Sequence, residues 1–168
     1  MRTLIVVASL LFFATPALAQ ARGELGIALG EVPELVEIED LDGTPVDLAR
    51  FVGEKPVLFE FWARWCENCL ALKPQLDAVA EAYEGRVNFV AIAVAVAQSP
   101  RSVKRYLEKE PVPFPTIWDT RGRAVRAFLA PATSYVAILD TDGRVIYTGI
   151  GPEQNIEAAV LEALNPTQ

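Results

Sequence analysis

The chain has 168 residues, 52% of them hydrophobic, and carries 15 Lys and Arg against 22 Asp and Glu, a formal net charge of −7 with no histidine. This length suits one compact domain with a substantial core, and the acidic balance argues against nucleic acid and anionic membranes as partners. Two cysteines without histidine supply half of the four ligands that structural zinc normally takes, so we expect no metal site.

The N-terminal residues have the pattern of a cleaved export signal. Arg2 precedes an apolar segment over residues 4–14, and the Ala-Leu-Ala sequence that ends at Ala19 suits signal peptidase. The segment is short for a membrane span, although an uncleaved anchor is the alternative, and no cysteine follows to accept a lipid. We therefore predict a signal peptide over residues 1–19 and one exported domain over residues 20–168.

The segment 33–51 predicts a strand, a turn, a second strand and a short helix. The Asp-Gly pair within the turn at residues 41–44 is a strong signal for a hairpin.

The central unit begins with an apolar run over residues 56–62, which is typical of a parallel strand buried on both faces. Apolar residues at helical spacing predict a helix over 66–84, and a second apolar run predicts a strand over 87–96. Together they form a right-handed βαβ crossover. Pro74 removes one hydrogen bond inside the helix and should bend it.

The rest of the chain predicts shorter elements. They are a helix over 100–110, an extended proline-rich connector, a strand over 116–119, a helix over 124–129, hairpin strands over 135–139 and 145–150, and a helix over 153–164. The order of these elements predicts an α/β fold, with a mixed sheet of four to six strands flanked by helices.

The two cysteines, Cys66 and Cys69, follow the central strand directly. With two residues between them they can close a small disulfide ring, and a position at a helix N-terminus stabilises the thiolate of Cys66. A bridge over so short a loop constrains little of the unfolded chain, which favours redox chemistry over a structural staple. We expect Cys66, the more accessible sulfur, to attack and Cys69 to resolve the intermediate.

The sequence Phe-Trp-Ala-Arg-Trp-Cys-Glu-Asn-Cys over residues 61–69, with Pro74 after it, resembles the active-site segment of the thioredoxin superfamily. Over roughly residues 32–165 the chain is most similar to the TlpA-like periplasmic thiol:disulfide oxidoreductases of bacteria. The resemblance implies a thioredoxin-like fold with an N-terminal hairpin and a central insertion. It also implies protein thiols and disulfides as substrates, no cofactor beyond the Cys66–Cys69 disulfide, and a membrane-bound protein as electron donor.

Glu60 is the candidate base for Cys69. It lies within the apolar strand, where an uncompensated carboxylate is unfavourable. Burial should raise its pKa and make it a proton acceptor near neutral pH, and its position matches the buried acidic residue of the family. The alternative is a Glu that points to a solvated edge.

Two residues beside Cys66 have candidate roles. The carboxylate of Glu67 should oppose thiolate formation and destabilise the reduced form, which favours a reductant, although it also complements the helix dipole. Trp65 offers a flat apolar contact for a partner, with simple packing as the alternative.

The substrate-aligning loop is where the sequence departs from the family. Where the family places a cis-proline before the last hairpin, this chain has Thr133 and Ser134, and the nearest proline is Pro131. The alternative position for this loop is Pro115-Thr116, although the hairpin signal after it is much poorer than the one at residues 135–150. We take Thr133 and Ser134 as candidate substrate-binding residues and expect a trans bond between them, because a cis bond before a non-proline residue is unfavourable by about 2.5–4 kcal/mol.

These inferences predict a monomeric periplasmic enzyme that reduces protein disulfides through a Cys66 mixed disulfide. Its electrons must come from another protein, because the periplasm has no thiol buffer. A dithiol oxidase is the first alternative. A copper-handling protein is the second, since two thiolates can bind Cu(I), and a redox-inert interaction domain is the third.

Overall fold

The computed structural model describes residues 25–165, and the predicted signal peptide lies outside them. Within this part of the chain, no helix combines the length and the apolar character needed to cross a membrane. The elements are β1 (Glu37–Asp40), β2 (Pro45–Asp47), the 3-10 helix η1 (Leu48–Phe51), β3 (Val57–Trp62), α1 (Glu67–Ala82), β4 (Asn88–Val94), α2 (Pro100–Leu107), β5 (Thr116–Asp119), α3 (Arg123–Ala127), β6 (Tyr135–Leu139), β7 (Val145–Ile150) and α4 (Ile156–Leu164).

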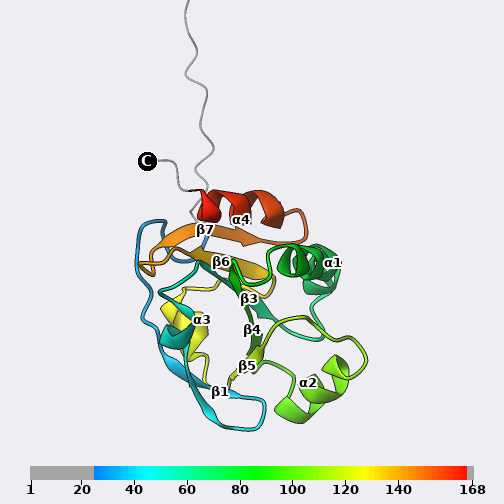
Figure 1. Ribbon diagram of the computed structural model, residues 1–168. Helices are drawn as coiled ribbons and strands as arrows, with labels where there is room; N and C mark the ends of the chain where they lie inside the picture. The colour runs from blue at the N-terminus through cyan, green and yellow to red at the C-terminus, as the bar shows by residue number, and fades with distance from the viewer. Residues whose placement is uncertain (1–24, 166–168) are drawn as a thin grey trace, which may run out of the picture.

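The strands form one mixed sheet in the order β2-β1-β5-β4-β3-β6-β7 (Figure 1). Strands β3, β4 and β5 are parallel, and the remaining pairs are antiparallel. The α/β class with helices flanking a mixed sheet is confirmed, but the expected count of four to six strands is wrong, since the sheet has seven. The N-terminal hairpin continues the sheet because Glu39 of β1 pairs with Trp118 of β5.

The central strand β3 supplies apolar side chains to both faces of the sheet, and all six of its residues are buried. Phe59 and Phe61 contact Phe128, which follows α3, with ring centroids 5.3 and 5.4 Å apart. Leu58 points the other way and packs in a cluster with Leu72 of α1. Figure 1 shows α1 and α3 on opposite sides of β3 and β4. Since side chains alternate along a strand, Glu60, two residues after Leu58, also faces α1.

Helix α1 places both cysteines at its start. Cys66 is the N-cap residue, and the helix runs through Pro74 to Ala82, close to the predicted range. Gly85 follows with φ of 74°, a left-handed conformation that glycine adopts without steric penalty. The predicted strands 135–139 and 145–150 are found at those residues. Helix α4 begins later than predicted because the side chain of Asn155 caps it, accepting a hydrogen bond from the N–H of Ala158 at 3.0 Å.

Candidate active site

Cys66 and Cys69 are joined by a disulfide, with their Cα atoms 5.2 Å apart. The Sγ of Cys66 also accepts a hydrogen bond from the N–H of Cys69 at 3.1 Å. This amide is one of the free donors of the first helical turn, and such a donor stabilises negative charge on the sulfur once the disulfide is reduced.

Exposure does not separate the two cysteines in this bridged state, since Cys66 is 5% exposed and Cys69 is 4% exposed. The expected difference in access is therefore not seen, and the order of attack stays a prediction. Their surroundings do differ: Cys66 lies between the exposed residues Trp65 and Glu67, whereas Cys69 lines an internal cavity.

Glu60 lines the same internal cavity as Cys69, a space of about 20 Å³ behind the disulfide. The carboxyl is buried, with Glu60 only 6% exposed, so it does not lie at a solvated edge of the sheet. Burial raises the pKa of Glu60 to about 8, with a further increase from the nearby Asp77 carboxylate and an opposing decrease from the Lys73 ammonium. The carboxyl therefore exchanges its proton close to neutral pH, where a general base is useful.

Trp62 also lines this cavity. Its Nε1 is buried and has no hydrogen-bond partner within residues 25–165, and the indole lines the cavity beside Glu60. A space of about 20 Å³ accommodates about one water molecule. The cavity therefore has room for one water among the side chains that line it, which include Cys69 and Glu60.

Lys73 and Asp77, which the sequence reading missed, form an ion pair on α1 beside this cavity. Lys73 lies one helical turn after Cys69, and Asp77 one turn after Lys73, so the three share one face of the helix. That spacing is visible in the sequence and could have identified the pair. Its relation to Glu60 depends on how α1 packs against β3.

Trp65 lies on the surface beside the disulfide and is 44% exposed. Its Nε1 donates a hydrogen bond to the carbonyl of Val96 at 2.8 Å, which fixes the ring against the loop after β4. Val96 is itself 59% exposed, and Leu70 on α1 is 44% exposed. Trp65, Val96 and Leu70 thus expose apolar surface around the cysteine motif.

A second residue that the sequence did not reveal, Gln98, ties the same loop to the cysteine motif. Its Oε1 accepts a hydrogen bond from the N–H of Arg64 at 3.1 Å, and its Nε2 donates to the carbonyl of Val94 at 2.7 Å. Gln98 lies far from the motif in the sequence, and no local pattern there indicates the contact. The amide side chain thus fixes the segment that leads into Trp65 and Cys66.

The loop at Thr133 and Ser134 has a trans peptide bond, as expected, because no cis bond occurs in the described residues. Ser134 is fully buried in a left-handed conformation with φ of 63°. Its N–H donates to the carbonyl of Phe61 at 2.8 Å, and its carbonyl accepts from Nε2 of Gln154 at 3.0 Å. Ser134 therefore has no surface to offer a substrate, contrary to the role expected for it, and instead fixes the loop. Thr133 is half-buried and keeps the candidate role.

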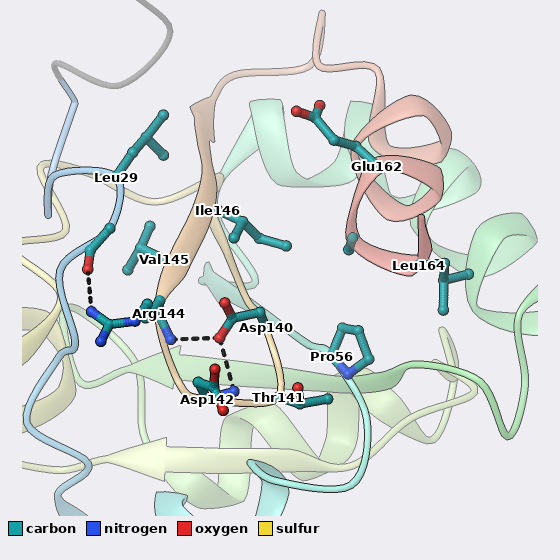
Figure 2. Close-up of a pocket in the computed structure, with 12 residues that line it drawn as sticks. Leu29, Pro56, Asp140, Thr141, Asp142, Arg144, Val145, Ile146, Glu162 and Leu164 are labelled. Atoms are coloured by element: carbon teal, nitrogen blue, oxygen red, sulfur yellow. Dashed lines mark hydrogen bonds between the residues drawn. The ribbon is translucent and has the colours of Figure 1, made fainter. Parts of the chain in front are cut away.

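A much larger hollow lies elsewhere, between the turn before β7 and helix α4, with a volume of about 680 Å³. Figure 2 shows Asp140 in the wall of this hollow, where its carboxylate accepts hydrogen bonds from the N–H groups of Asp142 and Arg144. Neither cysteine lines this space. Dithiol chemistry therefore belongs to the smaller site at the start of α1.

Comparison with known proteins places this site in context. The sequence model of the family described as Redoxin matches residues 28–164. Thiol-disulfide oxidoreductase ResA of Geobacillus kaustophilus is 26% identical over 142 residues, which cover 83% of this chain and 80% of ResA. Thioredoxin-like protein YneN of Bacillus subtilis is 27% identical over 141 residues, or 82% of this chain and 81% of YneN.

Solved structures of known proteins also match the fold of this chain. The structure of DsbF from MTB, described in mixed oxidised and reduced forms, superposes with a TM-score of 0.68 at 25% identity and covers 77% of this chain and 95% of DsbF. An uncharacterised conserved protein from Geobacillus kaustophilus superposes with a TM-score of 0.72 at 24% identity, covering 81% of this chain and 82% of its own, which supports the fold.

Proposed function

Because the chain belongs to the Redoxin family, and with it to the thiol:disulfide oxidoreductases of the thioredoxin superfamily, we propose that it reduces protein disulfides in the periplasm. The observation that carries this proposal is the shared cavity. One sulfur of the disulfide borders a buried carboxyl that exchanges its proton near neutral pH, while the other lies beside an exposed aromatic surface.

The reaction begins with the reduced enzyme. The thiolate of Cys66 attacks one sulfur of a client disulfide, the Cys66–client disulfide forms, and the first client sulfur leaves as a thiolate that takes up a proton. Glu60 then accepts the proton of Cys69. The Cys69 thiolate attacks the Sγ of Cys66, re-forms the Cys66–Cys69 disulfide and releases the second client thiolate. The client gains two electrons and the enzyme loses two.

A protein dithiol must then reduce the enzyme disulfide, since the periplasm offers no thiol pool for this purpose. We propose a membrane-bound protein donor, as the resemblance to TlpA-like enzymes implies. The redox-active disulfide serves as the only cofactor, and the enzyme acts as a monomer. Thr133, in the loop before β6, is the second residue that we propose to contact the client, together with Trp65.

The reductive direction is supported by the exposed Glu67, the first residue of α1. Its carboxylate lies next to Cys66 in the sequence and opposes ionisation of that thiol, which makes the reduced form less stable and a better donor. Because Glu67 is exposed, solvent screens this contribution, and it adjusts the potential without fixing it alone.

Measuring the reduction potential tests the proposal against its alternative, a dithiol oxidase. For a reductase we expect a value nearer to about −270 mV, as in thioredoxin, than to about −120 mV, as in the strong oxidant DsbA. A value near the DsbA end, with a strongly acidic Cys66 thiol, would assign the enzyme to oxidation. Capturing clients with the Cys69→Ser variant, in which the mixed disulfide cannot be resolved, would identify the substrates.

A further inference from the structure

Lys73 lies at the boundary between the internal cavity and solvent. It lines the cavity of about 20 Å³ together with Glu60 and Cys69, and it also lines a hollow of about 530 Å³ on the outer side of α1. Leu70 and Tyr106 line both spaces as well. Lys73 is thus the cationic side chain among those that separate the buried carboxyl from solvent.

The ammonium group of Lys73 is held in place from two directions. It donates hydrogen bonds to the carboxylate of Asp77 and to the carbonyl of Pro111, the latter at 2.8 Å. The side chains of Lys73 and Asp77 are only 23% and 25% exposed. The Oδ1 of Asp77 is buried and has no hydrogen-bond partner within residues 25–165. Partial burial limits solvent screening, so both charges act on Glu60 more strongly than surface charges would.

The two charges have opposite effects on Glu60. The Lys73 cation favours the ionised carboxyl and the Asp77 anion disfavours it, which is the direction that each gives to the pKa of Glu60. Among the other elements packed around Glu60, α2 contributes Tyr106, whose hydroxyl is also influenced by Glu110. The direct neighbours of Glu60 in the sheet are Ala91 of β4 and Val136 of β6, which carry no charge.

We propose that the Lys73–Asp77 pair controls the general base electrostatically. The pair sets the fraction of Glu60 that is ionised in the mixed-disulfide intermediate, before Cys69 attacks. The pair therefore sets the pH range in which the enzyme releases its reduced client. This inference rests on the proposed function, in which Glu60 accepts the proton of Cys69. Neither Lys73 nor Asp77 touches the reacting sulfurs in this scheme, and both act through Glu60.

The test uses the full mature protein and the aromatic disulfide DTNB. The reduced enzyme releases one thionitrobenzoate when Cys66 attacks and a second when Cys69 resolves the intermediate, so stopped-flow absorbance follows the two steps separately. The second rate, measured from pH 5 to pH 9, gives the midpoint of its pH profile. We expect Lys73→Met to move this midpoint up by about one pH unit and Asp77→Asn to move it down, because the variants remove charges of opposite sign.

Matched variants separate this role from a structural one. Lys73→Arg keeps the positive charge and should keep the midpoint, and in a Glu60→Gln background neither Lys73→Met nor Asp77→Asn should shift it. Lys73→Gln replaces Lys73→Met if the apolar side chain prevents folding. An ion pair that only stabilises α1 would lower the denaturation midpoint in both variants and leave the pH profile unchanged, which would overturn the inference. If Glu60→Gln itself resolves with the rate and pH profile of the wild type, the proposed base fails instead.

Discussion

Glu60 in the middle of β3 and Cys69 in the first turn of α1 line one internal cavity of about 20 Å³. The short connection from β3 to α1 brings the two side chains together, because Glu60 lies on the face of β3 that α1 covers. Only one of the two sulfurs gains this neighbour, which gives the two cysteines different chemical environments although their exposure is nearly equal.

Replacing Glu60 with Gln should slow resolution of the mixed disulfide and leave the first attack intact. The amide has nearly the same shape but cannot accept a proton, so we expect the second thionitrobenzoate release to slow by about 10²–10³-fold at pH 7. Alkylation of Cys66 should proceed at close to the wild-type rate and serves as the control for an intact fold. A variant that resolves as fast as the wild type would show that Cys69 loses its proton by another route.

The same substitution should change how stability depends on pH. The pKa of Glu60 is raised by burial from 4.5 to about 8 in the folded protein. Below about pH 4.5 the carboxyl is protonated in both the folded and the unfolded state. Between pH 4.5 and 8 only the unfolded state releases the proton, so the free energy of unfolding falls by about 1.4 kcal/mol per pH unit, and above pH 8 this loss levels off.

Urea denaturation of the oxidised wild type and of Glu60→Gln from pH 5 to pH 9 measures this contribution. We expect the wild type to lose stability relative to the variant up to about pH 8 and the difference to level off above it, with the variant the more stable protein at neutral pH. Parallel curves for the two proteins would mean that Glu60 ionises in the folded state as readily as in the unfolded state.

The order of attack can be read from labelling of the reduced protein. Because Cys66 caps α1 and its sulfur accepts an amide hydrogen bond, its thiolate should be the better stabilised, and iodoacetamide at mildly acidic pH should label Cys66 well before Cys69. Mass spectrometry of the digested protein measures both sites. Cys69→Ser should keep the fast labelling at Cys66. Equal rates at the two cysteines would remove the assignment, and faster labelling of Cys69 would reverse it.

Trp65 should matter for protein substrates more than for small ones. Trp65→Ala removes the exposed ring and the hydrogen bond to Val96, so we expect KM for a protein disulfide such as insulin to rise about tenfold, or about 1.4 kcal/mol. The first step with DTNB should change little. Trp65→Phe keeps a flat apolar ring but loses the N–H, so its KM for the protein disulfide should lie between those of the wild type and Trp65→Ala. If Trp65→Ala reacts with both substrates as the wild type does, the ring serves only to pack against the loop after β4.

The export prediction concerns residues outside the described part of the chain. In a Gram-negative host that expresses the whole sequence, N-terminal sequencing of the periplasmic fraction should give Gln20 as the first residue. A leader with Ala19→Arg should block cleavage and serves as the control. Recovery of the uncleaved wild-type chain in the membrane fraction would favour the N-terminal anchor instead.

The sequence alone predicted the redox pair and most of the fold. Cys66 and Cys69 come directly after an apolar run, and strand, helix and turn signals are local, so β3, α1 and the β6–β7 hairpin could be predicted within a few residues. The burial of Glu60 was also predictable, because a single carboxylate interrupts a strand whose neighbours are all apolar. The number of strands was not, because the pairing of β1 with β5 depends on contacts between segments far apart in the chain.

The tertiary structure decided which residues share the site. A strand buried on both faces is apolar on both, so its sequence does not tell which face α1 covers, and only packing places Glu60 on the side of Cys69. Packing likewise places Lys73 in the wall of the same cavity, while its ion-pair partner Asp77 lines the hollow outside it. Packing also buries Ser134. Its N–H donates to the carbonyl of Phe61 and its carbonyl accepts from Gln154, and these residues, distant in the sequence, meet only in the folded protein.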